Sequence, residues 1–130
     1  MDGTLTLDGM AAIVTGAGNG LGRAEALALA AAGARIVLND LAADDVHAVA
    51  DDIVAGGGEA VVAAGDIGEW ATGEELVAAA FRAYGRLDIL INNAGVLRAR
   101  GQMALARTPY RAQLRAVVTV SAAIPALAAA

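Results

Sequence analysis

Closely spaced glycines near the amino terminus form the residue pattern best suited to binding a phosphate. Residues 15–22 read Thr-Gly-Ala-Gly-Asn-Gly-Leu-Gly, between an apolar run and an Ala/Leu-rich segment. Glycine lets the backbone turn sharply and lets an anion approach the main chain. The first turn of a following helix then offers unpaired N–H groups and the positive end of its dipole. The pattern predicts a pyrophosphate-binding turn, and so a dinucleotide site.

A carboxylate supports this interpretation. Asp40 ends the next apolar run, about 20 residues after the glycine turn, where dinucleotide-binding domains hold the adenosine ribose. A carboxylate there accepts hydrogen bonds from both ribose hydroxyls and repels a 2′-phosphate. No basic residue directly follows Asp40, and Ala17 adds no positive charge to the turn. The sequence therefore favours NAD over NADP, with the alternative that Asp40 is a solvated turn residue.

The elements that must position these residues follow from apolar spacing. We expect strands at 11–15, 35–39, 60–64 and 87–91, helices at 21–32, 44–55 and 74–84, and a loop at 66–72. This alternation predicts an α/β fold, a Rossmann-type doubly wound parallel sheet that is incomplete, with about four strands and flanking helices. A further helix is expected at 109–120. The ligand crevice is expected at the carboxyl ends of the strands.

Composition excludes several other classes of function. The net charge of −5 argues against nucleic acid or an anionic membrane surface as a partner. Without cysteine and with His47 as the only histidine, the chain has too few ligands for a thiolate or histidine metal site. The mixed polar residues at the start do not resemble a signal peptide. We therefore expect a cytoplasmic protein without a bound metal.

Several motifs together resemble one family. Residues 15–22 and the Asn-Asn-Ala-Gly at 92–95 are similar to the motifs of the short-chain dehydrogenase/reductase family, classical type. Residues 39–41, 65–67 and 93–98 look most like its 3-oxoacyl reductase and hydroxyacyl-CoA dehydrogenase branches. The resemblance covers about residues 7–98 of a single expected domain, 1–130, with an atypical Arg/Ala-rich tail at 99–130.

The resemblance implies cofactor contacts in four places: the pyrophosphate turn, the adenosine ribose, the adenine and the inner ribose. The pyrophosphate turn would be formed by Gly16, Asn19, Gly20, Leu21 and Gly22, and the adenosine ribose would lie between Asp40 and Leu41. Asp66 and Ile67 would contact the adenine, and Asn93, Ala94 and Gly95 would line the inner ribose. Asn92 is expected to brace the central strands instead. The alternative for Asp66 is a helix N-cap or a loop residue.

The family's catalytic residues have no match in this sequence. The resemblance implies a serine and a Tyr-x-x-x-Lys, in which the lysine lowers the pKa of the tyrosine. All nine basic residues here are arginine. Tyr110 is followed at the third and fourth positions by Gln113 and Leu114, and Tyr84 is expected to pack in the core. No residue of the chain is therefore assigned a catalytic role.

Three interpretations remain open at the level of sequence. The first is an NAD(P)-dependent oxidoreductase that transfers hydride between a secondary alcohol or ketone and nicotinamide, represented by its cofactor-binding part and inactive alone. The second is a non-catalytic nucleotide-binding or interaction module. The third is a truncated or frame-shifted product, because no acidic residue follows Asp88. In each case an exposed sheet edge and an apolar tail predict self-association.

Overall fold

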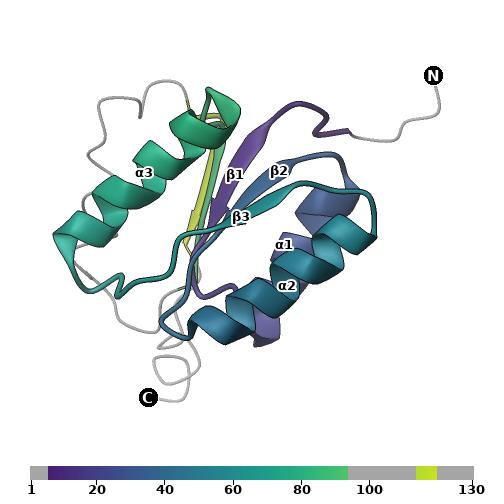
Figure 1. Cartoon of the computed structure of the whole chain (residues 1–130). Helices are drawn as coiled ribbons and strands as arrows, with labels where there is room; N and C mark the ends of the chain where they lie inside the picture. The colour runs from purple at the N-terminus through teal and green to yellow at the C-terminus, as the bar shows by residue number, and fades with distance from the viewer. Residues whose placement is uncertain (1–5, 94–113, 120–130) are drawn as a thin grey trace, which may run out of the picture.

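A parallel sheet forms the centre of the molecule. The computed structural model describes residues 6–93 and 114–119, and in this part five strands pair in the order β3-β2-β1-β4-β5 (Figure 1). The strands are β1 Ala11–Val14, β2 Arg35–Leu38, β3 Ala60–Val62, β4 Ile89–Asn92 and β5 Ala116–Thr119. The helices are α1 Gly20–Ala31, α2 Ala43–Ala55 and α3 Trp70–Tyr84. The predicted Rossmann-type α/β fold is confirmed, with five strands where about four were expected.

Helices cover both faces of the sheet. Figure 1 shows α1 and α2 on one face and α3 on the other. Alternate residues of β1 point to opposite faces, so Ala12 and Val14 pack with α1 and α2 while Ile13 packs with α3. All three of these side chains are fully buried. The central strand β1 is therefore apolar throughout its length, as expected for a parallel sheet covered on both sides.

The helix boundaries agree with the predictions except at one end. Gly33, at φ 105°, follows the end of α1, and Gly85, at φ 72°, ends α3, as the sequence pattern indicated. However, α3 begins at Trp70, so the prediction of a loop through residue 72 is wrong for its last three residues. Gly73 is buried inside this helix, and tertiary packing has outweighed the low helix propensity of glycine. No described helix is long and apolar enough to cross a bilayer.

The prediction of a helix at 109–120 is wrong where the structure describes it. Ala116–Thr119 is the parallel strand β5, and Ala116 pairs with Ile89 of β4. The spacing of Leu114, Val117 and Val118 is compatible with one face of a helix, but β-branched residues favour strands and β4 offered an unpaired edge. The remaining residues of this predicted helix lie outside the described part of the chain.

A buried carboxylate joins three strands at their amino ends. Asp88 accepts hydrogen bonds from the backbone N–H of Ala11 at 2.9 Å and from Nε and Nη2 of Arg86 at 2.7 and 2.8 Å. Nε of Arg115 lies 3.5 Å from its Oδ1. Burial alone raises the pKa of Asp88, but the hydrogen bonds and the two guanidinium charges outweigh burial and hold this pKa below its ordinary value. The carboxylate thereby stabilises the β1–β4–β5 edge.

We expect Asp88→Asn to lower the free energy of unfolding by about 1–3 kcal/mol near neutral pH. Because the pKa is lower in the folded state, the carboxylate stabilises the fold above the pKa of the unfolded chain, about 3.9, and this contribution disappears as the pH falls through the folded pKa. Urea denaturation across the acidic range should therefore show a shallower pH dependence in the variant. Asp51→Asn, an exposed residue of α2, is the control. An Asp88→Asn profile parallel to that of the parent would contradict this role.

Candidate dinucleotide-binding site

The predicted site residues follow strands whose carboxyl ends lie side by side. Val14 of β1 is in register with Leu38 of β2 and with Ile91 of β4. The chain order reverses at β1, and the crevice at such a switch point is where open α/β sheets bind ligands. The glycine turn leaves β1 here, Asp40 follows β2, and Asn93 follows β4. The fold therefore brings together three of the predicted segments.

Glycine is required at two positions of the turn by close backbone approaches. A Cβ on Gly22 would overlap the carbonyl group of Gly16, which leaves no room for any side chain. Gly16 itself adopts φ 63°, and its Cβ would lie 3.0 Å from the carbonyl oxygen of Asn93. The contact at Gly22 packs the start of α1 directly against the turn, and the contact at Gly16 packs the turn against the residue after β4. Because Gly22 belongs to the first turn of α1, the helix N-terminus is held over the carboxyl end of β1.

The N-terminus of α1 suits an anion. Its N-cap, Asn19, makes no side-chain capping hydrogen bond, and no acidic residue occupies the first turn. By contrast, the first turn of α2 contains Asp44 and Asp45. Gly20 adopts φ 56° with open space around its Cβ position. Unpaired N–H groups at an uncapped helix start are a ready site for phosphate.

Asp40 contacts the glycine turn directly. Its Oδ2 accepts the backbone N–H of Gly18 at 3.0 Å, and its Oδ1 accepts that of Leu41 at 2.8 Å. A Cβ on Gly18 would lie 2.9 Å from Asp40 Oδ2 and 2.9 Å from Cβ of Asp45, so this glycine also needs its small size. Each carboxylate oxygen has a second lone pair available for a ligand hydroxyl. The half-buried Asp40 therefore forms one wall of the site.

Two predicted positions present apolar surface beside these polar groups. Leu21 is 56% exposed and Leu41 is 70% exposed, which places both among the most exposed large hydrophobic residues of the described chain. Leu21 belongs to the first turn of α1, and Leu41 follows Asp40 directly. Exposed apolar side chains at a polar crevice are typical of binding surfaces.

Asn93 is fixed against the end of β1. Its backbone N–H donates to Oγ1 of Thr15 at 3.0 Å, and its Nδ2 donates to the carbonyl oxygen of Thr15 at 3.2 Å. Its Oδ1 is buried without a hydrogen-bond partner among the described residues. Such an orphaned acceptor is costly unless a ligand donates to it. Asn92 is the last residue of β4, in register with Thr119 of β5, and its Oδ1 is likewise buried without a partner among the described residues, so its role in bracing the strands stays a prediction.

Asp66 occupies a turn before α3. Its Oδ1 accepts the N–H of Gly68 at 2.7 Å, which is the geometry of an Asx turn, and its carbonyl oxygen accepts the N–H of Glu69. The N-cap of α3 is Glu69, so the N-cap alternative for Asp66 is wrong and the loop alternative describes its position. Ile67 packs against the core beneath α3. Ala94 and Gly95 lie outside the described residues.

Two further polar residues near the strand ends belong to the family-like motifs but were assigned no individual role from the sequence. Asn39 is buried and donates from Nδ2 to the carbonyl oxygens of Ala63 and Gly65 at 2.9 and 3.2 Å. Thr15 is equally buried. A polar residue directly after an apolar strand is the signal that could have identified both.

Tyr84 has a structural role, as predicted. It packs against the core on the α3 side, and its hydroxyl donates to the carbonyl oxygen of Ile36 at 2.8 Å. Burial and the charge of Glu59 raise the pKa of Tyr84 to about 12, although Arg35 opposes this shift. A phenol with this pKa is poorly matched to proton transfer near neutral pH.

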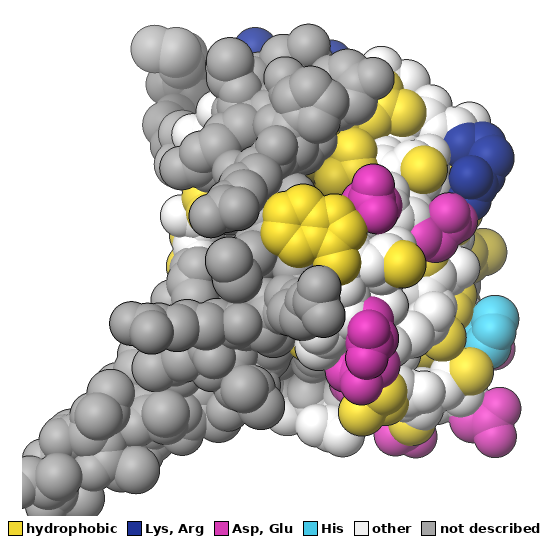
Figure 2. Space-filling view, turned by 90° about the vertical axis from the view of Figure 1, so that its left-hand side faces the viewer, with side chains coloured by type: hydrophobic (Ala, Val, Ile, Leu, Met, Phe, Trp, Pro, Cys, Tyr) yellow, Lys and Arg dark blue, Asp and Glu magenta, His cyan; other side chains and the backbone are white. Residues whose placement is uncertain are grey.

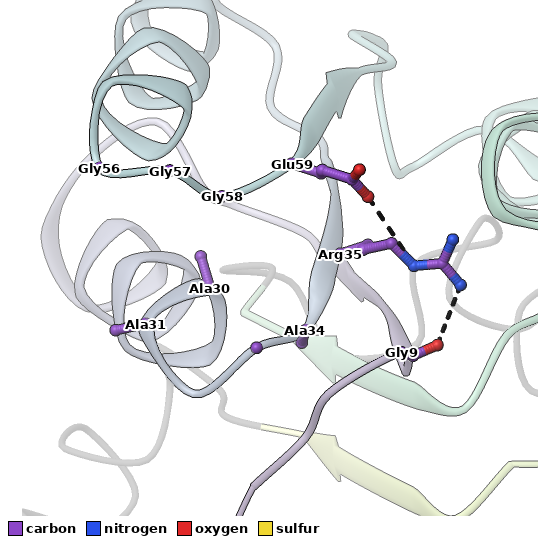
Figure 3. A pocket seen from close by; sticks show the side chains of 10 residues that line it. Gly9, Ala30, Ala31, Ala34, Arg35, Gly56, Gly57, Gly58 and Glu59 are labelled. Carbon is purple, nitrogen blue, oxygen red and sulfur yellow. Dashed lines mark hydrogen bonds and ion pairs between the residues drawn. The ribbon is translucent and has the colours of Figure 1, made fainter.

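A hollow lies at the amino ends of β2 and β3, away from the glycine turn. It measures about 390 Å³ (Figure 3). Its charged lining residues are Arg35 and Glu59. The others are small residues, most of them at the ends of α1 and α2: Gly9, Ala30, Ala31, Gly33, Ala34, Gly56, Gly57 and Gly58. Arg35 donates to the carbonyl oxygen of Gly9 at 2.9 Å and lies 3.9 Å from Glu59. Because its charged groups pair with the protein, this hollow is a weaker candidate than the glycine turn.

The face of the molecule shown in Figure 2 carries mainly acidic and apolar side chains. In Figure 2 acidic side chains are interspersed with apolar ones on the face shown, and no broad basic patch is visible among its coloured residues. In the ranges 6–93 and 114–119, no group of three histidine or acidic residues is arranged to hold a metal ion. His47 is exposed on α2, as expected for a surface residue.

Comparison with known proteins identifies the family. The family model for short chain dehydrogenases matches residues 10–126, which is nearly the whole chain. The chain belongs to the short-chain dehydrogenase family. The match extends beyond residue 98, where the sequence motifs end, and includes the edge strand β5.

Short-chain dehydrogenases from distant organisms are similar to this chain. The hydroxyacyl-CoA dehydrogenase ChsB1 of Mycobacterium tuberculosis is 52% identical over 102 residues, covering 75% of this chain and 32% of the relative. Peroxisomal multifunctional enzyme type 2 of Drosophila melanogaster is 46% identical over 110 residues, covering 76% of this chain and 18% of the relative. The chain thus spans a third or less of the length of these two relatives.

Solved structures of short-chain dehydrogenases share the fold. A 7 alpha-hydroxysteroid dehydrogenase, complexed with NADH and 7-oxo glycochenodeoxycholic acid, gives a TM-score of 0.69 at 42% identity, covering 71% of this chain and 36% of that one. A metagenomic short-chain oxidoreductase in complex with NADP gives a TM-score of 0.65 at 42% identity, and the match covers 69% of this chain and 41% of that one. A nicotinamide dinucleotide is therefore the expected cofactor class. The two neighbours differ in which dinucleotide they hold.

We expect Gly22→Ala to abolish dinucleotide binding and to lower the free energy of unfolding by about 2 kcal/mol or more, because α1 must move away from the carbonyl of Gly16. Gly56→Ala is the matched control, since its Cβ would meet only ordinary contacts at 3.6 Å. Denaturation and titration with dinucleotide measure both effects. Equal behaviour of the two variants would show that the close approach at Gly22 is unimportant.

Proposed function

We propose that this chain binds NAD and supplies the cofactor-binding part of a short-chain dehydrogenase that transfers hydride between a secondary alcohol or ketone and nicotinamide. One observation supports it above the others: the uncapped, acid-free start of α1 lies directly against the glycine turn, with Asp40 beside it. The helix start suits a pyrophosphate, and the carboxylate suits a ribose.

Each polar group at the site has a distinct task in this proposal. The N–H groups at the start of α1 bind the pyrophosphate, and Gly20 leaves open space for it. Asp40 accepts hydrogen bonds from the adenosine ribose through the lone pairs that its contact with Gly18 leaves available. The unpaired Oδ1 of Asn93 accepts a hydrogen bond from a hydroxyl of the second ribose. When bound, the nicotinamide ring supplies the hydride chemistry.

The preference for NAD over NADP rests on local charge. Asp40 contacts the turn, and Asp44 and Asp45 occupy the first turn of the neighbouring helix α2. A 2′-phosphate on the adenosine ribose would add negative charge beside these carboxylates. At about 4 Å, such repulsion costs roughly 1–4 kcal/mol per pair of charges, depending on exposure to solvent.

We expect NAD to bind the parent chain at least about tenfold more tightly than NADP, because about 1.4 kcal/mol of repulsion suffices for that ratio. Asp40→Asn should narrow the gap, since an amide oxygen still accepts the N–H of Gly18 but carries no charge. Isothermal titration calorimetry with both dinucleotides gives the ratio, and Asp51→Asn on the exposed side of α2 is the control, since Asp52 pairs with Arg23 of α1. Equal affinity of the parent for NAD and NADP would refute the charge argument.

Hydride transfer also requires a proton donor or acceptor for the substrate oxygen. The described site presents none, and the chain has no lysine to complete the family's Tyr-x-x-x-Lys. We therefore propose that this chain alone binds cofactor without catalysis. This behaviour would equally fit the second interpretation, a nucleotide-binding module.

We expect the purified chain to form no NADH from NAD and a panel of secondary alcohols, including a 3-hydroxyacyl thioester, because it lacks the catalytic lysine. NADH absorbance measures the reaction, and a complete short-chain dehydrogenase is the positive control. NADH formation that scales with chain concentration and disappears in Gly22→Ala would contradict the proposal of an inactive cofactor-binding part.

Two finer points extend the proposal. The similarity to a hydroxyacyl-CoA dehydrogenase supports a hydroxyacyl or oxoacyl thioester as the substrate of the whole protein. Self-association is proposed at β5, whose Val117 and Val118 are 41% and 42% exposed. An edge strand offers unpaired backbone groups to a further strand.

A further inference from the structure

Asn39 is hydrogen-bonded to several segments of the site, through both its backbone and its side chain. It is 1% exposed and follows β2 directly. Its backbone N–H donates to the carbonyl of Val14 at 3.0 Å, and its own carbonyl accepts the N–H of Ala17 at 2.9 Å. These two bonds fasten the end of β2 to the glycine turn.

The side chain of Asn39 bonds to the segment that follows β3. Its Nδ2 donates to the carbonyls of Ala63 and Gly65, so both amide hydrogens are used. The backbone N–H of Gly65 in turn donates a hydrogen bond to the carbonyl oxygen of Asp40 at 3.1 Å. The segment after β3, which leads to Asp66, is thereby held against the carboxylate that flanks the glycine turn.

We propose that Asn39 is a positioning residue for the adenosine half of the dinucleotide. It acts through three segments that it joins: the glycine turn, the residues around Asp40, and the turn at Asp66. This inference rests on the proposed cofactor function. Without the amide donors, the carbonyls of Ala63 and Gly65 lose their partner, and the Asp66 side of the site moves away from the Asp40 side.

Thr15 provides a matched comparison on the other side of β1. It is as fully buried as Asn39, and it also joins two strand ends, but toward Asn93 after β4. Asn39 therefore braces the adenosine side, whereas Thr15 braces the side assigned to the second ribose. A substitution that only weakened the fold would affect both halves of the dinucleotide alike.

The first experiment compares AMP with NAD on the full chain under conditions where each variant is folded by circular dichroism. Asn39→Leu should weaken AMP and NAD by the same factor, about ten- to a hundredfold. Thr15→Val should weaken NAD but leave AMP within about twofold. In Asn39→Asp, a protonated carboxyl can donate to one carbonyl, so AMP affinity relative to the parent should rise as the pH falls, while Asn39→Leu shows no such rise. An unchanged AMP affinity in Asn39→Leu, or equal loss of AMP in Thr15→Val, would overturn the proposal.

A second experiment needs no ligand and separates this inference from the cofactor proposal. Amide hydrogen exchange of Asn39→Leu should speed up at Gly65 and Ala17, whereas Thr15→Val should speed up exchange at Asn93. Unchanged protection of Gly65 in Asn39→Leu refutes the positioning role even if the parent binds NAD. If the parent binds neither NAD nor AMP, the proposed function and the positioning role both fail, and faster exchange at Gly65 then shows only that Asn39 holds the three segments together.

Discussion

The close packing of α1 on the glycine turn is the constraint on which the rest of the site depends. Only a residue without a side chain fits at Gly22, because the carbonyl group of Gly16 occupies the space of a Cβ. This contact directs the helix N-terminus toward the carboxyl end of β1, where the strand order reverses. The strands on either side then contribute Asp40 and Asn93 to the same crevice. A single backbone approach thus decides where the start of α1 meets the sheet, which is the place proposed for the pyrophosphate.

Polar groups differ in how fully they are hydrogen-bonded at the two ends of the sheet. At the amino ends, the carboxylate of Asp88 is satisfied by Ala11 and Arg86, and it stabilises the strands. At the carboxyl ends, α1 begins without a side-chain cap, and Oδ1 of Asn93 is buried without a described partner. Leaving polar groups unpaired costs stability unless a ligand satisfies them. This difference is consistent with the proposal that the carboxyl ends of β1 and β4 bind the dinucleotide.

Much of the fold was predictable because its determinants are local. Apolar runs bounded by glycine gave β1 to β4 and α1 to α3 to within a few residues, and Gly33 and Gly85 end helices as expected. Two errors have the same physical origin. Trp70 begins a helix that the sequence placed later, and Ala116–Thr119 forms a strand where a helix was expected. In both places a partner remote in sequence, the sheet beneath α3 or the edge of β4, outweighed local propensity.

The sequence by itself predicted the class of ligand, since glycine spacing and the position of Asp40 are typical of a turn that admits a pyrophosphate and of a carboxylate that meets a ribose. It also determined that the chain carries no lysine. Only the tertiary structure decided which residues hold these groups in place. Asn39 and Thr15 look like ordinary polar residues in the chain, and their role depends on hydrogen bonds to Gly65 and Asn93. Such partners lie many residues away, and parallel pairing of the strands is what brings them within reach.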